Sequence, residues 1–224
     1  MIQSIGEFMV SRRTYRRVLL DELLQKHLSL LKGLILDVGG EKLNPRGKSR
    51  PESDLARTYY INISLENRPD LIGDALRLPV RAASVDCVIC CEVLEHIPEP
   101  AVCCNEMFRV LKPGGTLIIS TPFMFPIHAD PHDFYRYSPD GLRYLCREFQ
   151  EFKTVPMGGW LGTLGMFLEI GAAELNRGLL QKLARVALTR LGRLLSYVEW
   201  RYRVPSWSTR RFSTGYFCIA TKSK

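Results

Sequence analysis

The amino-acid sequence predicts an α/β fold with a mostly parallel sheet and helices on both of its faces. Short apolar runs typical of buried strands alternate along the chain with segments whose apolar residues recur at helical spacing. The segment from Val85 to Thr121 has the strongest pattern: a buried strand, a helix, a Pro-Gly-Gly turn and a second buried strand. Polar residues follow where the first of these strands ends, namely Glu92, Glu95 and His96. Open parallel sheets bind ligands at this edge, so the sequence predicts a site there.

The first part of the chain is expected to supply one helix and three strands. Residues 14–32 place apolar side chains at helical spacing and predict an amphipathic helix. Apolar runs at residues 34–38 and 59–63 predict two strands, and residues 71–72 predict a third, short one. Residues 41–58 are polar and rich in proline, which predicts a loop.

The remainder of the chain is expected to supply four strands and two helices. The helix expected at residues 99–111 ends at Lys112-Pro113-Gly114-Gly115, a strong stop signal. Ser138 and Pro139 suit the N-cap and the first position of the second helix. The expected elements are a strand centred on residues 87–90, helix 99–111, strand 116–120, helix 138–147, and strands 152–155 and 216–221.

Length and composition fit one globular domain. The 224 residues are 46% hydrophobic and contain no uninterrupted apolar run of membrane-spanning length. The apolar part of the N-terminus precedes its basic part, the reverse of a secretory signal. Seven cysteines, an odd number, lie mostly on segments expected to be buried, which predicts a reduced, cytoplasmic protein. Cys87 and Cys90 have the spacing of a zinc pair, but strand residues three apart face opposite sides, so no metal is expected.

The net charge of +8 belongs to one segment. Residues 176–211 contain nine Lys or Arg and one acid, whereas the rest of the chain has 22 basic and 22 acidic residues. Residues 157–212 are therefore predicted to form a basic helical insertion or lid within a single domain spanning residues 1–224. The segment carries an apolar stripe at helical spacing: Leu179, Leu180, Leu183, Ala187, Leu191, Leu194, Leu195 and Val198.

Three interpretations of the segment 176–211 remain open. It is a helix docked on its own domain with a solvated basic face, a contact with the inner membrane surface, or a nucleic-acid-binding surface. Trp200, Tyr202 and Trp207 favour the membrane surface. Nucleic acid is disfavoured, because Glu92 to Glu95 replace the Asn/Asp-Pro-Pro-aromatic motif used to methylate a flipped base.

Three short motifs follow the expected strands. Asp37-x-Gly39-Gly40 forms a glycine bend that lets the backbone approach a ligand closely. Asp74 follows the short strand at residues 71–72, and Glu92 follows the next strand. Each motif alone fits an ordinary turn or cap. Their order along the chain, before the Lys-Pro-Gly-Gly turn, is what favours a binding function.

This order resembles the class I S-adenosylmethionine-dependent methyltransferases, over residues 30–155 and the last strand. The segments GDALRLPVRAASVDCVICCEVLEHI and RVLKPGGTLIIST are similar to the small-molecule, methyltransferase type 11-like branch of that family. The resemblance implies a Rossmann-like, doubly wound sheet of seven strands with an antiparallel last strand. It also implies that S-adenosylmethionine is the cofactor.

The resemblance also implies where the cofactor binds. In the family, an acid and glycines after the first strand flank the methionine moiety, and an acid after the second strand binds the ribose. A further acid contacts the adenine, and the end of the fourth strand lines the far side. The implied contacts are Asp37, Gly39, Gly40, Glu41, Asn62, Ser64, Asp74, Ala75, Leu76 and Glu92.

Two departures from the family pattern leave a second hypothesis open. Glu41 stands where the first loop usually has a glycine, and Asn62 or Ser64 stands where the ribose carboxylate is expected. Glu41 or Glu66 can substitute for that carboxylate. The alternative is a non-catalytic cofactor-binding or regulatory protein that retains the fold.

The aromatic and polar loop at residues 123–137 contains two of the four histidines. It is a structural lid, a substrate site with His128 or His132 as general base, or a metal site. The candidate metal ligands are His128, Asp130, His132 and Asp133. Tyr135, Arg136 and Tyr137 are expected to shape the acceptor pocket.

Together these patterns predict methyl transfer to a small-molecule or lipid-linked acceptor, such as a hydroxyl group on a sugar or related metabolite.

Overall fold

The computed structural model describes residues 13–40, 42, 55–128, 132–175, 178–202 and 211–223. The chain divides into two compact units, each built from two stretches of sequence. One unit comprises Met1–Glu22 with Pro156–Gly215, and the other comprises Leu23–Val155 with Tyr216–Lys224. The single domain predicted for residues 1–224 stays a prediction.

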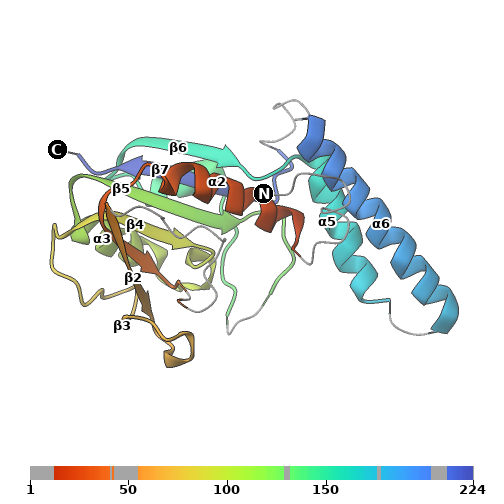
Figure 1. Cartoon of the computed structure of the whole chain (residues 1–224), viewed down its shortest axis with the longest axis horizontal. Helices are drawn as coiled ribbons and strands as arrows, with labels where there is room; N and C mark the ends of the chain where they lie inside the picture. Colours follow the sequence, from red (N-terminus) through yellow and green to blue (C-terminus); the bar gives the residue numbers. More distant parts are fainter. Residues whose placement is uncertain are drawn as a thin grey trace. The chain divides into compact units, whose positions relative to one another are not determined.

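A seven-stranded sheet forms the centre of the larger unit (Figure 1). Its strand order is β3-β2-β1-β4-β5-β7-β6. The strands from β3 to β5 pair in parallel, with Asp37 of β1 opposite Tyr60 of β2 and Ile89 of β4. Their bounds are β1 Gly33–Val38, β2 Ala56–Asn62, β3 Leu71–Ile72, β4 Val85–Cys91 and β5 Leu111–Pro122.

The last strand runs antiparallel to its neighbours. Near the start of β5, the Gly114 N–H donates to the Lys222 carbonyl oxygen, and the Lys222 N–H donates to the Gly115 carbonyl oxygen; Lys222 follows β7 (Gly215–Thr221). Met157, which follows β6 (Gln150–Pro156), donates its backbone N–H to Gly215 at the start of β7. The predicted seven-stranded sheet with an antiparallel last strand is confirmed.

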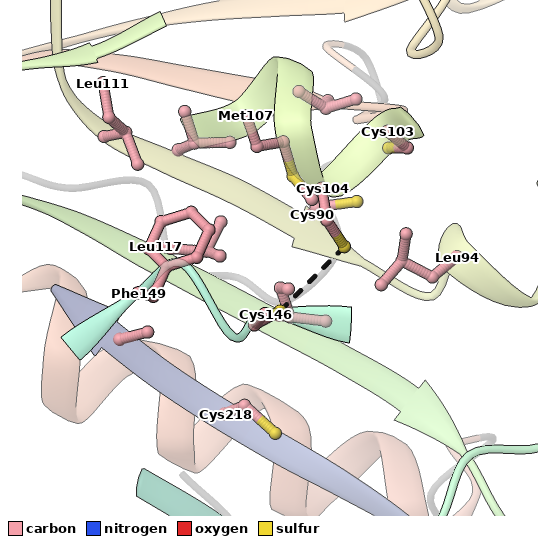
Figure 2. Close-up of a cluster of buried hydrophobic side chains, with 14 of the residues drawn as sticks. Cys90, Leu94, Cys103, Cys104, Met107, Leu111, Leu117, Cys146, Phe149 and Cys218 are labelled. Atoms are coloured by element: carbon pink, nitrogen blue, oxygen red, sulfur yellow. Dashed lines mark hydrogen bonds between the residues drawn. The ribbon is translucent and has the colours of Figure 1, made fainter. Parts of the chain in front are cut away.

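Helices pack on both faces of the sheet. On one face, α3 (Pro100–Val110) contributes Met107 to a buried cluster with Val88 of β4 and Leu117 of β5. Figure 2 shows this cluster, in which Cys90, Cys103, Cys104 and Cys146 lie among aliphatic and aromatic side chains. Strand residues alternate between faces, so Phe217 of β7 faces the other side, where it stacks on His27 of α2 (Tyr15–Leu28).

All seven cysteines are free and buried, as expected of a reduced protein. The Sγ atoms of Cys104 and Cys146 lie 3.9 Å apart. Burial in apolar surroundings raises the pKa of the Cys218 thiol to about 12. These thiols are therefore core residues rather than nucleophiles.

The smaller unit contains a hairpin of two helices, α5 (Trp160–Ala173) and α6 (Gly178–Tyr202), which lie side by side in Figure 1. Glycines allow this close approach: a Cβ atom on Gly165 would lie 2.3 Å from the carbonyl oxygen of Gly192. Buried Glu199 of α6 accepts hydrogen bonds from the Tyr15 hydroxyl and the Gly159 N–H. The hairpin is thereby joined to the first turn of α2.

The apolar stripe predicted on α6 is not the face that packs. The buried residues of α6 are Gly192, Ser196 and Glu199, whereas Leu180 and Leu183 of the stripe are exposed. The reason is the glycine contact, which selects the small-residue face of α6 for packing against α5. None of the helices in the described part of the chain has the length and hydrophobicity that a membrane-spanning segment requires.

Element bounds differ from the predictions mainly at turns. The first helix ends at Leu28, because a turn precedes Gly33. The predicted Lys112–Gly115 turn lies inside β5, where the pairing with β4 shifts register. Helix α4 (Pro139–Leu145) begins as predicted, with the Ser138 Oγ accepting the Gly141 N–H.

Candidate functional site

In the loop after β1, the backbone lies very close to the side chains of Val93 and Asp37. Gly39 has φ +73°, and a Cβ atom there would lie 2.5 Å from Cγ2 of Val93. A Cβ atom on Gly40 would lie 2.5 Å from Cγ of the Asp37 carboxyl group. The positive φ of Gly39 therefore favours glycine at that position, whereas a side chain at Gly40 would displace the Asp37 carboxylate.

The ends of β2 and β3 lie beside this loop. The Asn62 side chain donates to the Gly40 carbonyl oxygen and accepts the Ser64 N–H. The Ser64 hydroxyl accepts the Glu66 N–H at the start of η1 (Leu65–Asn67). The first loop and the second strand end are thus held together through an amide side chain.

Asp74 follows β3 and shapes the next turn. The carboxylate of Asp74 accepts the Leu76 N–H at 2.9 Å, and Ala75 and Leu76 pack against the core. Gly73 donates its N–H to the Asn62 carbonyl oxygen, so Asp74 lies next to the second strand end. Glu41 lies outside the described residues.

Glu92 follows β4 in a left-handed conformation, with φ +57°. Residues with a Cβ atom adopt this conformation at a cost, and such positions cluster at functional sites. Its carboxylate accepts the buried Ser120 hydroxyl at 2.6 Å, which joins the ends of β4 and β5. Four strand ends thus bring polar groups to one edge of the sheet.

The edge fits an adenosine-containing cofactor. The close-approach glycines face the segment after β4 through the Gly39–Val93 contact, while Asp37, Asn62 and Asp74 supply polar atoms along the edge. These are donors and acceptors suited to an amino acid, a ribose and a base. The ten predicted contacts therefore include nine described residues, and the structure places them along adjacent strand ends.

The loop after β5 folds onto η2 (Leu94–His96), the segment after β4. Phe134 donates its N–H to the Glu95 carbonyl oxygen, and the Tyr135 hydroxyl donates to that of Pro98. His96 Nδ1 lies against the His132 carbonyl oxygen. Two segments more than thirty residues apart in sequence therefore meet at the same edge as the glycine loop.

Within this loop, His128 is oriented by Asp133. The Asp133 carboxylate accepts the His128 N–H at 2.8 Å, and its Oδ2 lies 3.2 Å from His128 Nδ1. Arg136 donates to both oxygens of the same carboxylate. The hydrogen bond from Arg136 lowers the pKa of Asp133 far below its usual range, so this carboxylate stays ionised. A carboxylate close to one ring nitrogen favours the protonated imidazole, so His128 can take up a proton.

His132 is placed differently. Its ring is exposed and lies against Phe134, and its carbonyl oxygen rather than its ring contacts His96. Of the two predicted general bases, His128 has the orienting partner.

The three residues predicted to shape an acceptor pocket differ in exposure. Tyr137 is buried, and its hydroxyl donates to the Leu94 carbonyl oxygen. Arg136 donates to the carbonyl oxygens of Phe125 and Pro126 as well as to Asp133. Tyr135 is partly exposed. Their role toward an acceptor stays a prediction.

The predicted set of metal ligands is only partly visible, since Asp130 lies outside the described residues. The structure instead brings Glu95 and His96 to His128, with ligand atoms within 4.8 Å of one another. Glu95 and His96 were predicted only as polar residues at a strand end. The third residue, His128, was predicted as a functional histidine of the loop after β5. That it lies beside His96 depends on the fold and could not be predicted from the sequence.

Part of the chain matches a known protein family. Residues 52–119 match the family model described as a methyltransferase domain. A ubiquinone biosynthesis O-methyltransferase of Psychrobacter cryohalolentis is 31% identical over 128 residues, which is 50% of this chain and 48% of that protein. The chain thus spans about half the length of the curated relatives it matches.

A second relative is more similar over a shorter range. A protein of Mycolicibacterium smegmatis, described as a probable S-adenosylmethionine-dependent methyltransferase, is 46% identical over 105 residues. That match covers 46% of this chain and 40% of the relative.

Solved structures show the fold. A S-adenosylmethionine-dependent methyltransferase from Archaeoglobus fulgidus matches with a TM-score of 0.55 at 16% identity, covering 92% of this chain and 94% of that one. The cyclase SpnF matches with a TM-score of 0.54 at 19% identity, covering 95% and 83%. At these identities the likeness establishes the arrangement of the sheet.

Proposed function

We propose that the chain transfers a methyl group from S-adenosylmethionine to a small-molecule or lipid-linked acceptor. The proposal is supported by the match of residues 52–119 to a methyltransferase-domain model and by a sheet arranged as in a solved methyltransferase. A hydroxyl group on a sugar or related metabolite is the acceptor we favour. The observation that carries the proposal is the meeting of the glycine loop, Glu92 and the oriented His128 at one edge of the sheet.

In this proposal the strand ends hold the cofactor. Asp37, Gly39 and Gly40 surround the methionine moiety, Asn62 and Ser64 contact the ribose, and Asp74 with Ala75 and Leu76 contacts the adenine. Glu92 lines the far side, and Glu41 remains part of the proposed set. When bound, S-adenosylmethionine supplies a methyl carbon already activated by its sulfonium group.

His128 removes the proton from the acceptor hydroxyl. Asp133 lies 3.2 Å from Nδ1, and we assign Nε2 as the nitrogen that accepts the proton. His132 remains a second candidate base, and Tyr135, Arg136 and Tyr137 are the candidates for acceptor contacts. The chain's own contribution is alignment of acceptor and donor together with proton removal.

Calorimetry with S-adenosylmethionine tests the cofactor assignment. We expect saturable binding that Asp74→Ala weakens at least tenfold, because the variant loses both the polar atoms and the turn they form. Asp140→Ala, an exposed change at the start of α4, is the matched control and should bind as wild type. The absence of binding at millimolar cofactor would overturn the enzyme proposal.

Transfer is then measured with tritium-labelled methyl groups and a bacterial small-molecule and lipid extract as acceptor. We expect labelled product from the wild type and little from His128→Ala. Cofactor binding without any labelled product would favour the alternative, a regulatory or non-catalytic protein. The cyclase SpnF shares the fold, so the sheet alone does not establish methyl transfer.

We also propose that α6 contacts an anionic membrane surface, which would suit a lipid-linked acceptor. Seven apolar side chains of α6 are exposed: Leu179, Leu180, Leu183, Val186, Leu191, Leu194 and Tyr202. The same helix carries five basic residues and one acid, Glu199, which is buried. Exposed apolar side chains beside basic ones complement a lipid surface with anionic headgroups.

A further inference from the structure

We propose that Glu95, His96 and His128 form a binding site for a divalent transition-metal ion of the zinc type. One carboxylate and two imidazoles each offer a ligand atom, and these atoms lie within 4.8 Å of one another. Zinc ligands about 2.0–2.2 Å from the ion lie roughly 3.3–3.6 Å from each other, so small side-chain rotations suffice to complete the site.

The first support is the orientation of His96. Its Nδ1 contacts the His132 carbonyl oxygen, while its Nε2 lies 3.8 Å from Oε1 of Glu95. Histidines that bind metals usually donate their other ring N–H to a carbonyl or carboxylate, which fixes the tautomer. His96 has this arrangement, with Nε2 directed toward Glu95.

The second support is His128, which has the same arrangement with a carboxylate. Asp133 lies 3.2 Å from Nδ1 of His128, and the rings of His96 and His128 meet edge to face at 5.1 Å. Asp133 is itself held by the Arg136 guanidinium. Both imidazoles therefore have an oxygen atom close to one ring nitrogen, as the supporting residues of a metal centre provide.

The third support is charge. Glu95 is fully buried, and Glu92 and Glu95 both act electrostatically on Arg136. Arg136 also balances Asp133. Arg136 thus pairs with Asp133 and feels the charges of Glu92 and Glu95, and these four groups have a net charge of −2 when all are ionised. A bound dication compensates such an excess in a buried setting.

The cluster lies directly after β4, beside Glu92 and Ser120. If the proposed methyl transfer holds, a cation there would lower the pKa of a hydroxyl group that it contacts. Nε2 of His128 then serves as a ligand, and it serves as the proton acceptor only in the metal-free protein. Metal binding itself does not depend on the proposed methyl transfer.

The test uses the full chain, stripped with a chelator and titrated with zinc chloride in a calorimeter, without cofactor. We expect one equivalent of zinc. His96→Ala, His128→Ala and Glu95→Gln should each weaken binding by about 100-fold or more, and Asp133→Asn by about 10–100-fold. His132→Ala is the matched control: its carbonyl oxygen remains, so zinc binding should stay within about twofold of wild type.

Cobalt substitution identifies the ligands independently of affinity. Nitrogen and oxygen ligation should give visible bands that disappear in His128→Ala, whereas near-ultraviolet thiolate bands would place the metal on cysteines and overturn the proposal. Failure to bind one equivalent of zinc, or binding unchanged in both histidine variants, would also overturn it. Circular dichroism shows whether Glu95→Gln folds, and the partly exposed His96 and His128 provide variants with less effect on the core.

The outcomes for metal and methyl transfer are separable. Methyl transfer by a protein that binds no zinc would leave the proposed function standing and remove the metal site. Zinc binding without transfer would do the reverse.

Discussion

At Asp133 a single side chain organises the loop after β5. Its carboxylate accepts the His128 backbone N–H, contacts the His128 ring and receives the two-pronged Arg136 guanidinium. The side chain of Asp133 is almost completely buried, so the ion pair is shielded from water. Hydrogen bonds to a charged group in such a setting each contribute about 1.5–3 kcal/mol. The position of His128 therefore depends on this carboxylate.

Asp133→Asn is expected to lower the free energy of unfolding at pH 7 by about 1–3 kcal/mol. Because the folded-state pKa of Asp133 is lowered, its contribution is present above the unfolded pKa of about 4 and is lost as pH falls through the folded value. The difference between wild type and variant should thus be constant from pH 8 to pH 5 and shrink at pH 3. Urea unfolding at each pH measures it.

Asp140→Asn serves as the control for this series, because Asp140 is exposed. It should change stability by less than about 0.5 kcal/mol at pH 7. A wild-type advantage over Asp133→Asn that grew at pH 3 would contradict the ionised-carboxylate explanation.

At the scale of elements, the α5–α6 hairpin depends on backbone contact. Gly165 and Gly192 approach so closely that a Cβ atom on either would meet the other's carbonyl oxygen within 2.4 Å. Arg193 and Glu169 add an ion pair across the same interface. Backbone atoms cannot rotate away as a side chain can, so the crossing tolerates only glycine.

Gly165→Ala is expected to lower the free energy of unfolding by about 1–3 kcal/mol, since the helices must separate. Gly171→Ala is the matched change on the same helix, where a Cβ atom would meet nothing within 4 Å. That variant should gain about 0.5–1 kcal/mol from its higher helix propensity. Denaturant unfolding followed by circular dichroism compares them, and equal effects would show that the close crossing is not maintained.

At the scale of the whole molecule, charge and exposed apolar surface coincide on one segment. The net charge of residues 176–211 equals the +8 of the entire chain. In the described part of this segment, Leu179 and Leu180 are 74% and 82% exposed. The partner proposed for α6 therefore has to bind both basic and apolar side chains.

Vesicles of phosphatidylglycerol are expected to sediment the protein, and phosphatidylcholine vesicles to sediment much less. Burying a leucine side chain is worth about 1.5–3 kcal/mol, so replacing Leu180 and Leu183 by Gln should weaken sedimentation at least tenfold. Leu30→Gln is the control, because Leu30 is also highly exposed but lies outside α6. High salt should weaken binding to anionic vesicles.

Two results would contradict the membrane contact. One is equal sedimentation of the leucine variant and the wild type. The other is a dimer in analytical ultracentrifugation that the same leucine replacements abolish, which would assign the face to a second copy of the chain.

Much of the sheet follows from local sequence. The strand and helix after Val85 were predicted because buried strands consist of runs of apolar residues. Ser138 and Pro139 begin α4, as their preferences for the N-cap and the first helical position predict. The glycine bend at Gly39 was predicted for a similar reason, and its positive φ confirms it. These features depend on residues within one turn or one strand.

The sequence by itself therefore determined most individual strands and helices, the glycine loop and the basic character of one segment, because each depends on neighbours along the chain. Only the tertiary structure decided that Asp133 orients His128, that Glu95 and His96 lie beside it, and that α6 packs by Gly192 rather than by its leucines. Those contacts join residues far apart in sequence. Their geometry depends on how strands pair and helices cross, which the periodicity of a single segment does not encode.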